Sequence, residues 1–201
     1  MRLGLFGGSF DPVHLGHLEL ARQCQQQAHL DKVWFLPAAN QPLKESGPVA
    51  SDDDRCAMLE LALTSDLSWI VDRTEIDRGG VSYTVDTLRE IRGRQPGEDL
   101  FFLMGADSLH DLPEWREPEA ILELATPLVV ARAGEPSLNF ELLADLCLPE
   151  RIEEISLAMV EMPGMAISST EIRARAGRGE SLEGFVTAPV AEYILRHEIY
   201  Q

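Results

Sequence analysis

The chain has little positive charge. Its 201 residues include 17 lysines and arginines against 34 aspartates and glutamates, which gives a formal net charge of −17. Only two of the basic residues are lysines, Lys32 and Lys44. Binding to a nucleic-acid backbone needs a broad basic face, so this composition argues against a nucleic-acid partner. An anionic small molecule would have to be met by a local cluster of donors or by a metal ion.

Cysteines and long apolar runs are also scarce. Cys24, Cys56 and Cys147 lie far apart and form no C-x-x-C pair, which indicates neither a disulfide framework nor a zinc site. No apolar stretch approaches the roughly 18 to 20 residues that a membrane span needs, and the first residues lack the length of a secretory signal. We therefore expect a soluble, cytoplasmic protein without a membrane contact. Whether it is a monomer or a homo-oligomer stays open.

Short apolar runs alternate with segments of helical period. This alternation predicts an α/β fold, a Rossmann-like, doubly wound and mostly parallel sheet with helices on both faces. Strands are expected at Arg2–Phe6, Lys32–Leu36, Trp69–Asp72, Leu100–Met104, Leu128–Ala131 and Ile155–Met159. Helices are expected at Leu15–Ala28, Asp53–Leu63, Val85–Arg92, Pro118–Leu124, Ser169–Ala176 and Pro189–His197. We expect one domain over residues 1–201, with a C-terminal helical part from about residue 164 packed on it, and a ligand at the carboxyl ends of the strands.

The first predicted strand runs into the unusual stretch GGSFDPVHLGH. Gly7 and Gly8 let a ligand approach the backbone or let φ become positive. The helix expected to begin near His14 has unpaired N–H groups at its amino end, which favour phosphate. His14 and His17 share a face of its first turn and can both donate hydrogen bonds to phosphate oxygens. The alternatives are an ordinary turn with solvated histidines, or a metal pair, although helical zinc pairs usually sit four residues apart with a neighbouring Glu.

A second candidate site lies near the C-terminus. Ser168 and Glu171 have the spacing of a capping box, so the simplest interpretation is a well-capped helix. That interpretation leaves Arg173 and Arg175 unexplained, because basic groups near a helix start oppose its dipole unless an anion is present. With the hydroxyl of Ser169, these groups predict a second phosphate site.

Further candidates lie in the middle of the chain. Gly105 follows a predicted strand and would flank the same cleft as Gly7 and Gly8 if the two strands are neighbours. Asp107 could bind a ribose, lie near a metal, or only cap the next segment. Trp115 is either a core residue or a platform for a flat aromatic ligand. Lys44, on a long loop over residues 37–50, is a candidate for a phosphate contact.

These motifs resemble a known family. GGSFDPVHLGH resembles the G-x-F-D-P-x-H-x-G-H signature of the adenylyl and cytidylyl nucleotidyltransferases, and ISSTEIR resembles their I-S-S-T-x-I-R signature. SYTVDTL, GAD followed by a tryptophan, and LVVARAG resemble the bacterial nicotinate mononucleotide adenylyltransferases in particular, over most of the chain. The resemblance implies transfer of the adenylyl group of ATP to nicotinate mononucleotide in NAD biosynthesis. The products would be nicotinate adenine dinucleotide and pyrophosphate, and Mg²⁺ would be carried by the ATP phosphates rather than by a protein metal site.

The resemblance also implies roles for individual residues. The catalytic residues would be His14, His17, Lys44 and Arg173. ATP would be bound by Gly7, Gly8, Ser9, Phe10, His14, His17, Gly105, Asp107, Ile167, Ser168, Ser169 and Arg173. The mononucleotide would be bound by Asn40, Lys44, Thr84, Trp115, Arg116 and Arg132, with its ring stacked on the tryptophan and its carboxylate held near Thr84 and Arg116.

Two positions depart from the family pattern. Gln41–Pro42–Leu43–Lys44 stands where the family usually has P-P-H-K or P-P-H-R, so a histidine and any role it had are lost. Ser9 stands where threonine is commoner, which preserves the hydroxyl.

Other functions remain open on the sequence alone. A transferase of the same superfamily could act on nicotinamide mononucleotide, phosphopantetheine or a phosphorylated alcohol. The chain could also be a non-catalytic nucleotide-binding regulator, which intact His14, His17 and Arg173 disfavour. A redox enzyme with a bound dinucleotide is disfavoured because no G-x-G-x-x-G motif follows the first strand.

Overall fold

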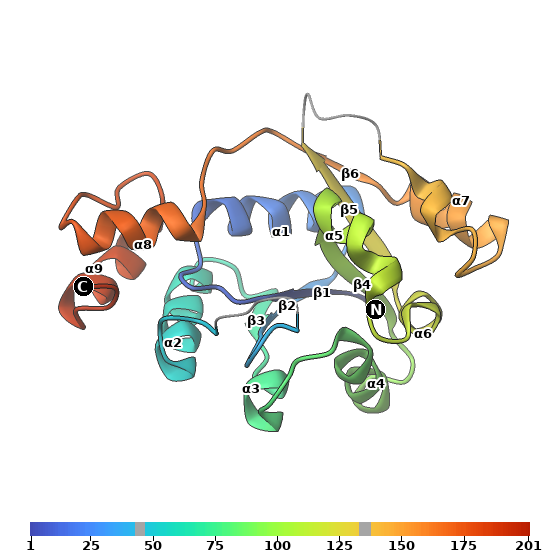
Figure 1. Cartoon of the computed structure of the whole chain (residues 1–201), viewed down its shortest axis with the longest axis horizontal. Coiled ribbons are helices and arrows are strands. Elements are labelled where there is room, and N and C mark those ends of the chain that lie inside the picture. The colour runs from blue at the N-terminus through green and yellow to red at the C-terminus, as the bar shows by residue number, and fades with distance from the viewer. Residues whose placement is uncertain (43–46, 133–137) are drawn as a thin grey trace. The chain divides into compact units, whose positions relative to one another are not determined.

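The computed structural model describes residues 1–42, 47–132 and 138–201 (Figure 1). The strands are β1 Arg2–Gly8, β2 Lys32–Pro37, β3 Trp69–Val71, β4 Asp99–Gly105, β5 Thr126–Arg132 and β6 Val160–Met162. The helices are α1 Leu15–Gln27, α2 Asp52–Leu63, α3 Thr74–Arg78, α4 Thr84–Arg94, α5 Ala106–Asp111, α6 Pro118–Leu124, α7 Pro149–Leu157, α8 Ser169–Gly177 and α9 Ala188–Arg196, with 3-10 turns at Leu112–Glu114 and Phe140–Leu143. Within the described ranges, no helix has the length and apolar character needed to cross a membrane.

The strands follow the order β3-β2-β1-β4-β5-β6, so strand order reverses between β1 and β4. The β1–β4, β4–β5 and β5–β6 pairs are parallel, with Arg2 opposite Asp99 and Phe101 opposite Thr126. The predicted Rossmann-like fold is confirmed. The sequence left open whether the strands ending in Gly8 and Gly105 are neighbours, and in the structure β1 pairs directly with β4.

Residues of β1 and β4 are buried on both faces, as expected of parallel strands covered by helices. Leu3 and Leu5 are fully buried, and Leu103 is 1% exposed. Gly4 has a packing reason, because a Cβ at this position would lie 2.6 Å from Leu30 Cδ1.

The described residues form two compact units. The first contains residues 1–7, 20–33 and 83–164, and the second contains residues 8–19, 34–82 and 165–201. In the first unit, α4 and the C-terminal part of α1 lie on opposite faces of β1 and β4 (Figure 1). In the second, α2 packs against β3 and α9. The expectation of one domain over residues 1–201 stays a prediction.

All six predicted helices are present, with ends that differ from the prediction by at most two residues. The predicted strand Ile155–Met159 is wrong, because α7 runs through Leu157 and the strand β6 begins at Val160. Pro149 starts this helix, at a position where its missing N–H costs nothing. A short apolar run does not distinguish a helix end from a strand.

Two adjacent glycines favour a hairpin-like turn, but Gly79 and Gly80 have a different role here. The short helix α3, which the sequence pattern did not reveal, ends at Gly79. Gly79 and Gly80 have φ values of 67° and 70°, a region that glycine enters without steric cost. The pair therefore ends a helix and lets the chain turn back.

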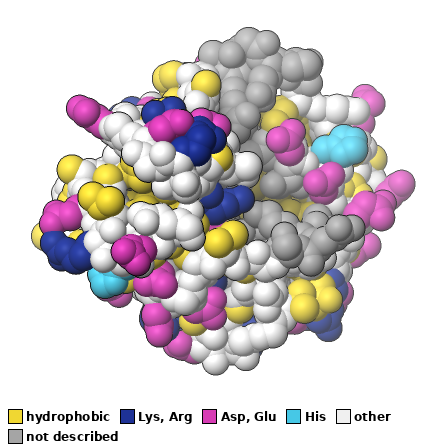
Figure 2. Space-filling model, turned by 60° about the vertical axis from the view of Figure 1, so that its left-hand side comes forward, with side chains coloured by type: hydrophobic (Ala, Val, Ile, Leu, Met, Phe, Trp, Pro, Cys, Tyr) yellow, Lys and Arg dark blue, Asp and Glu magenta, His cyan; other side chains and the backbone are white. Residues whose placement is uncertain are grey.

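Acidic side chains are scattered over the face of the molecule shown in Figure 2 rather than gathered in one patch. This distribution agrees with the formal net charge of −17. Any binding site for a phosphate must therefore depend on local donors.

Candidate functional site

The loop between β1 and α1 is shaped by Phe10. Its φ is 47°, so the left-handed backbone, which was one of two roles considered for Gly7 and Gly8, lies at Phe10 instead. The Phe10 side chain is 1% exposed, and its ring meets the ring of His17 edge-on at 5.1 Å between centroids. A Cβ on Gly8 would lie 3.1 Å from the Phe10 ring. The Phe10 ring therefore packs against His17, and the lack of a side chain at Gly8 leaves space for the Phe10 ring.

His14 and His17 form one stacked pair. Their ring centroids are 3.7 Å apart and the rings are inclined by 20°. The backbone N–H of His14 donates to His17 Nδ1 at 3.2 Å, and the backbone N–H of His17 donates to His14 Nδ1 at 3.3 Å. Because both Nδ1 atoms accept, each neutral ring carries its hydrogen on Nε2. The backbone thus selects the tautomer in which Nε2–H is the donor offered to a ligand.

Burial lowers the pKa of His14 to about 4. The side chain is therefore neutral at pH 7 in the ligand-free protein, and it acts as a hydrogen-bond donor rather than as a positive charge. Its buried position, 8% exposed, is the physical cause, because burial disfavours the charged imidazolium.

This low pKa predicts a pH dependence of stability. Between pH 6.5 and 4 the unfolded chain binds a proton at His14 that the folded chain does not bind, so the free energy of unfolding falls as the pH falls through this window. The loss is on the order of 2 kcal/mol by pH 4.5. His14→Asn lacks this titration, so wild type should lose stability relative to the variant between pH 7 and pH 4.5 in urea unfolding. An equal stability difference at the two pH values would contradict the assignment.

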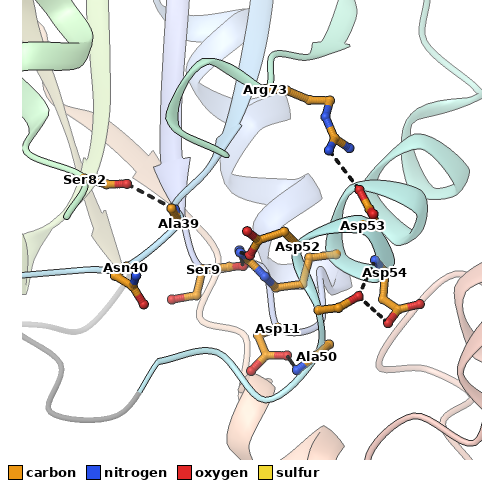
Figure 3. Close-up of polar contacts among 12 residues, drawn as sticks. Ser9, Asp11, Ala39, Asn40, Ala50, Asp52, Asp53, Asp54, Arg73 and Ser82 are labelled. Carbon is orange, nitrogen blue, oxygen red and sulfur yellow. Dashed lines mark hydrogen bonds and ion pairs between the residues drawn. The ribbon is translucent and has the colours of Figure 1, made fainter. Parts of the chain in front are cut away.

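Asp11, to which the sequence analysis assigned no role, is buried and accepts hydrogen bonds from several segments of the chain, and Figure 3 shows its contact with Ala50. Its Oδ2 accepts from the Val49 N–H at 2.8 Å, and its Oδ1 accepts from the Ala50 N–H at 3.1 Å. Oδ1 also accepts from the hydroxyl of Tyr200 at 2.8 Å. Arg173 donates to the Asp11 main-chain oxygen at 2.8 Å. Distant segments therefore converge on one residue, a feature that no local pattern indicates.

The start of α8 is bonded to the same loop. Ser168 caps the helix, since its Oγ accepts from the Glu171 N–H at 3.2 Å. Ser169 Oγ donates to the Pro12 carbonyl at 3.0 Å, next to the bond from Arg173 to Asp11. Ile167 lies close as well, because its Cβ is 4.0 Å from a Cβ built on Gly16. The two signature motifs, far apart in sequence, are thus neighbours in the second unit.

Some groups that we expected to face a phosphate are used inside the protein. The Leu15 N–H at the start of α1 donates to the Phe185 carbonyl at 2.9 Å, and the His17 N–H donates to the His14 carbonyl at 2.9 Å. The predicted set of unpaired N–H groups is therefore wrong for these two. Arg175 also has a structural role, since it lies over the Phe185 ring and pairs with Glu180 at 3.3 Å. An anion is not needed to explain it.

Arg55 of α2 is a second residue that the sequence analysis missed. Its side chain is fully buried. Nη1 donates to the Ser9 carbonyl at 2.6 Å and Nη2 to Asp52 Oδ1 at 2.5 Å. Within the described residues its Nε has no partner. Arg55 thus fixes the backbone of the β1–α1 loop and places a buried positive charge beneath it.

The chain segment after β2 is bonded to Ser82 near Asn40, within the second unit. The Ser82 N–H donates to the Asn40 carbonyl at 2.8 Å, and Ser82 Oγ accepts from the Ala39 N–H at 3.1 Å (Figure 3). Asn40 is exposed, and Gln41 Oε1 accepts from the Ser9 hydroxyl at 3.0 Å. The predicted residue Lys44 lies outside the described residues, and so does Leu43.

The first unit contains the residues predicted to bind a pyridine ring. Trp115 meets Phe102 edge-on at 6.0 Å, and its Nε1 is buried without a hydrogen-bond partner among the described residues. Arg116 lies over the Tyr83 ring at 4.8 Å and pairs with Asp86 at 3.2 Å. Thr84, the first residue of α4, adjoins Tyr83 in sequence. The structure thus brings Arg116 to the start of α4.

The next residue, Glu117, has an unusual backbone. Its φ is 52°, in the left-handed region. Arg89 holds its carboxylate with two hydrogen bonds of 3.1 and 2.6 Å. This pair fixes the chain directly after Trp115 and Arg116.

Three further predicted residues lie in this unit, at the ends of β4 and β5 and in the first turn of α5. Gly105 ends β4, and a Cβ there would meet nothing within 4 Å, so packing within the described residues does not explain the glycine. Asp107 is exposed in the first turn of α5. Arg132 ends β5, and its side chain lies outside the described part. The ligand contacts assigned to all these residues stay predictions.

The described part of the chain contains no group of three or more His, Cys, Asp or Glu side chains arranged to hold a metal ion. The histidine pair alone supplies two nitrogen atoms, and both Nδ1 atoms already accept backbone hydrogen bonds.

Comparisons with known proteins agree with the motifs. The sequence profile of the cytidylyltransferase-like family matches residues 5–175. A protein of Thermus thermophilus named "Probable nicotinate-nucleotide adenylyltransferase" is 45% identical over 203 residues, covering 100% of both chains. A protein of the same name from Rhodopirellula baltica is 39% identical over 99% of this chain and 93% of its own length.

Solved structures share the fold. A putative nicotinate-nucleotide adenylyltransferase from Vibrio parahaemolyticus has a TM-score of 0.70 at 20% identity, covering 100% of this chain and 96% of its own. Plasmodium falciparum nicotinic acid mononucleotide adenylyltransferase, solved in complex with NaAD, has a TM-score of 0.72 at 16% identity, covering 99% and 97%.

Proposed function

Because the chain belongs to the cytidylyltransferase-like family, we propose that it transfers the adenylyl group of ATP to nicotinate mononucleotide, a step of NAD biosynthesis. The mononucleotide's phosphate oxygen forms a bond to the α-phosphorus of ATP, and the bond from that phosphorus to the bridging oxygen of pyrophosphate breaks. The products are nicotinate adenine dinucleotide and pyrophosphate. One observation carries the proposal within the chain: Ser169 and Arg173 are bonded to the loop that precedes the histidine pair.

This reaction needs little acid–base help from the protein. A phosphate monoester has a second pKa near ~6, so the attacking oxygen is already ionised at neutral pH. A nucleophilic Ser or Cys is therefore unnecessary, and the protein's tasks are alignment and charge neutralisation. Two unit charges about 4 Å apart repel by about 4 kcal/mol at an effective dielectric constant of 20, and each substrate carries more than one charge.

The residues near the β1–α1 loop supply donors suited to this task. The Nε2–H groups of His14 and His17 donate to oxygens of the ATP phosphates, and Arg173 contributes a full positive charge. Because His14 is neutral, a substantial part of the neutralisation must come from elsewhere. We propose that ATP enters as its Mg²⁺ complex, with Mg²⁺ held by the phosphates.

Trp115 is expected to stack on the pyridine ring of the mononucleotide. Stacking of a base on an aromatic side chain contributes about 1 to 3 kcal/mol. Trp115→Ala should therefore raise KM for nicotinate mononucleotide about 5- to 100-fold with a small change in KM for ATP, measured by initial rates with each substrate varied. Trp115→Phe keeps an aromatic face and should recover most of the loss. A rise confined to KM for ATP would remove Trp115 from the mononucleotide site.

The substrate assignment is tested by ATP-dependent pyrophosphate release. Nicotinate mononucleotide, nicotinamide mononucleotide and phosphopantetheine are offered separately, and the dinucleotide product is identified by mass spectrometry. Nicotinate mononucleotide should give the highest kcat/KM, and EDTA in excess over Mg²⁺ should stop release with any acceptor. Faster release with another acceptor would reassign the substrate, and no release with any of the three would favour a non-catalytic nucleotide-binding protein.

A further inference from the structure

Beyond α9, which ends at Arg196, the chain returns to the loop that carries the first signature motif. Tyr200 has a φ of 72°, and its hydroxyl donates to Asp11 Oδ1 at 2.8 Å. Burial, and next the Asp11 carboxylate, raise the pKa of this phenol, so it stays a protonated donor across the physiological range. Its main chain lies against α8, because a Cβ on Gly177 would come within 3.0 Å of the Tyr200 carbonyl oxygen. Tyr200 is thus fixed between the Asp11 carboxylate and the helix that carries Arg173.

Three neutral donors hold the Asp11 carboxylate, whose side chain is 5% exposed. The N–H groups of Val49 and Ala50 bond one oxygen each, and the Tyr200 hydroxyl adds a second bond to Oδ1. A carboxylate has lone pairs for about four such bonds, so this one is largely satisfied without a hydrogen bond from a charged donor.

Arg173 forms a long ion pair with this carboxylate but no hydrogen bond to it. Its Nη1 donates to the main-chain oxygen of Asp11 at 2.8 Å, whereas Nη1 and Asp11 Oδ2 are 3.8 Å apart. Side chains at this distance need only a small rotation to form a direct charge-assisted hydrogen bond, which is stronger than a neutral one. Any loss of neutral donors from the carboxylate would favour that rotation.

We propose that Tyr200 is a positioning residue for adenylyl transfer, whose hydrogen bond to Asp11 keeps the 3.8 Å ion pair between Arg173 and the Asp11 carboxylate from closing into a direct hydrogen bond, and so leaves the guanidinium for the ATP phosphates. The inference rests on the proposed function only for the effect on kcat. The effect on ATP affinity can be measured without catalysis, because ATP binding also depends on the guanidinium of Arg173. Without the Tyr200 hydroxyl, Asp11 Oδ1 loses a hydrogen-bond donor, and the side chain of Arg173 rotates to form a direct hydrogen bond with the Asp11 carboxylate. The charge of Arg173 is then neutralised inside the protein.

The chain offers a matched control in the same C-terminal region. The hydroxyl of Tyr193 in α9 donates to Asp54 Oδ1 at 3.0 Å, so Tyr193→Phe also removes one phenol–carboxylate hydrogen bond. Asp54 lies in the first turn of α2, where its other carboxylate oxygen accepts from the Ser51 hydroxyl. Both variants should therefore lower the melting temperature modestly, whereas only Tyr200→Phe should affect the charge of Arg173.

The experiment compares wild type, Tyr200→Phe and Tyr193→Phe for MgATP affinity by calorimetry and for kcat by pyrophosphate release. Tyr200→Phe should weaken MgATP binding and lower kcat, each by about three- to tenfold, with KM for nicotinate mononucleotide unchanged. Tyr193→Phe should match wild type within about twofold. Equal effects of the two variants, or unchanged affinity and kcat in Tyr200→Phe, would overturn the proposal.

A second comparison tests whether the effect passes through Arg173. In an Arg173→Ala background, Tyr200→Phe should change MgATP affinity and kcat no further, because the charge that it protects is gone. An equal loss of MgATP affinity and kcat in both backgrounds would show that Tyr200 does not act through Arg173. If wild type releases no pyrophosphate with any acceptor, the proposed function fails, while the calorimetric comparison still decides the role of Tyr200.

Discussion

Replacing His17 by alanine should lower kcat about 100- to 1000-fold and leave the protein folded. The proposed role of the imidazole Nε2–H is to donate to the ATP phosphates as negative charge shifts toward the departing pyrophosphate, and loss of one such preorganised donor typically costs this much. The ring is only half-buried, and its main structural contacts are those with Phe10 and the stacked His14. The rate is measured as pyrophosphate release at saturating MgATP and nicotinate mononucleotide.

Two further variants make the His17 result specific. His17→Gln places an amide N–H near the position of Nε2 and should recover part of the activity, because it restores a hydrogen-bond donor there. His110→Ala removes an imidazole that is 86% exposed and should keep full activity. An unchanged kcat in His17→Ala would exclude the ring from the mechanism.

Asp11→Ala should lower the free energy of unfolding by about 3 to 5 kcal/mol. Removal of this carboxylate leaves the Val49 and Ala50 N–H groups and the Tyr200 hydroxyl without their acceptor, in a site that is 4% exposed. Each buried donor without a partner costs about 1 to 3 kcal/mol, and the positive charge of Arg173 loses a nearby counter-charge. The measurement is urea unfolding at pH 7.

Matched substitutions separate the Asp11 network from a general effect of charge removal. Asp11→Asn keeps one oxygen acceptor and should lose roughly half as much stability. Asp145→Ala removes an exposed carboxylate and should change stability by less than about 0.5 kcal/mol. A loss below about 1 kcal/mol in Asp11→Ala would show that the bonds to Asp11 contribute little to folding.

The helices and buried strands could be predicted from the sequence because local periodicity and capping encode them. The capping of α8 by Ser168 is such a case, since its spacing to Glu171 alone gives the hydrogen bond. The pairing of β1 with β4 is among the few topologies that an alternating α/β chain permits, but the sequence alone did not select it. The strand predicted at Ile155–Met159 failed because a short apolar run carries no period of its own.

The supporting network of the candidate site could not be predicted. The Tyr200–Asp11 bond joins residues 189 positions apart, and the buried Arg55 reaches the Ser9 carbonyl across 46 positions. Neither contact can be read from the neighbouring sequence, because tyrosine, aspartate and arginine are common on protein surfaces and nothing local marks these three as buried partners. The tautomer of the histidine pair could not be predicted either, since it follows from two backbone N–H bonds to Nδ1 atoms that only the structure shows.

The central claim is that a single polyphosphate contacts both signature motifs. A crystal structure of the complex with Mg²⁺ and a non-hydrolysable ATP analogue tests it most directly. The account predicts phosphate oxygens within about 2.7 to 3.2 Å of both His17 Nε2 and the Arg173 guanidinium. A triphosphate bound elsewhere, with neither side chain in reach of any phosphate oxygen, would contradict it.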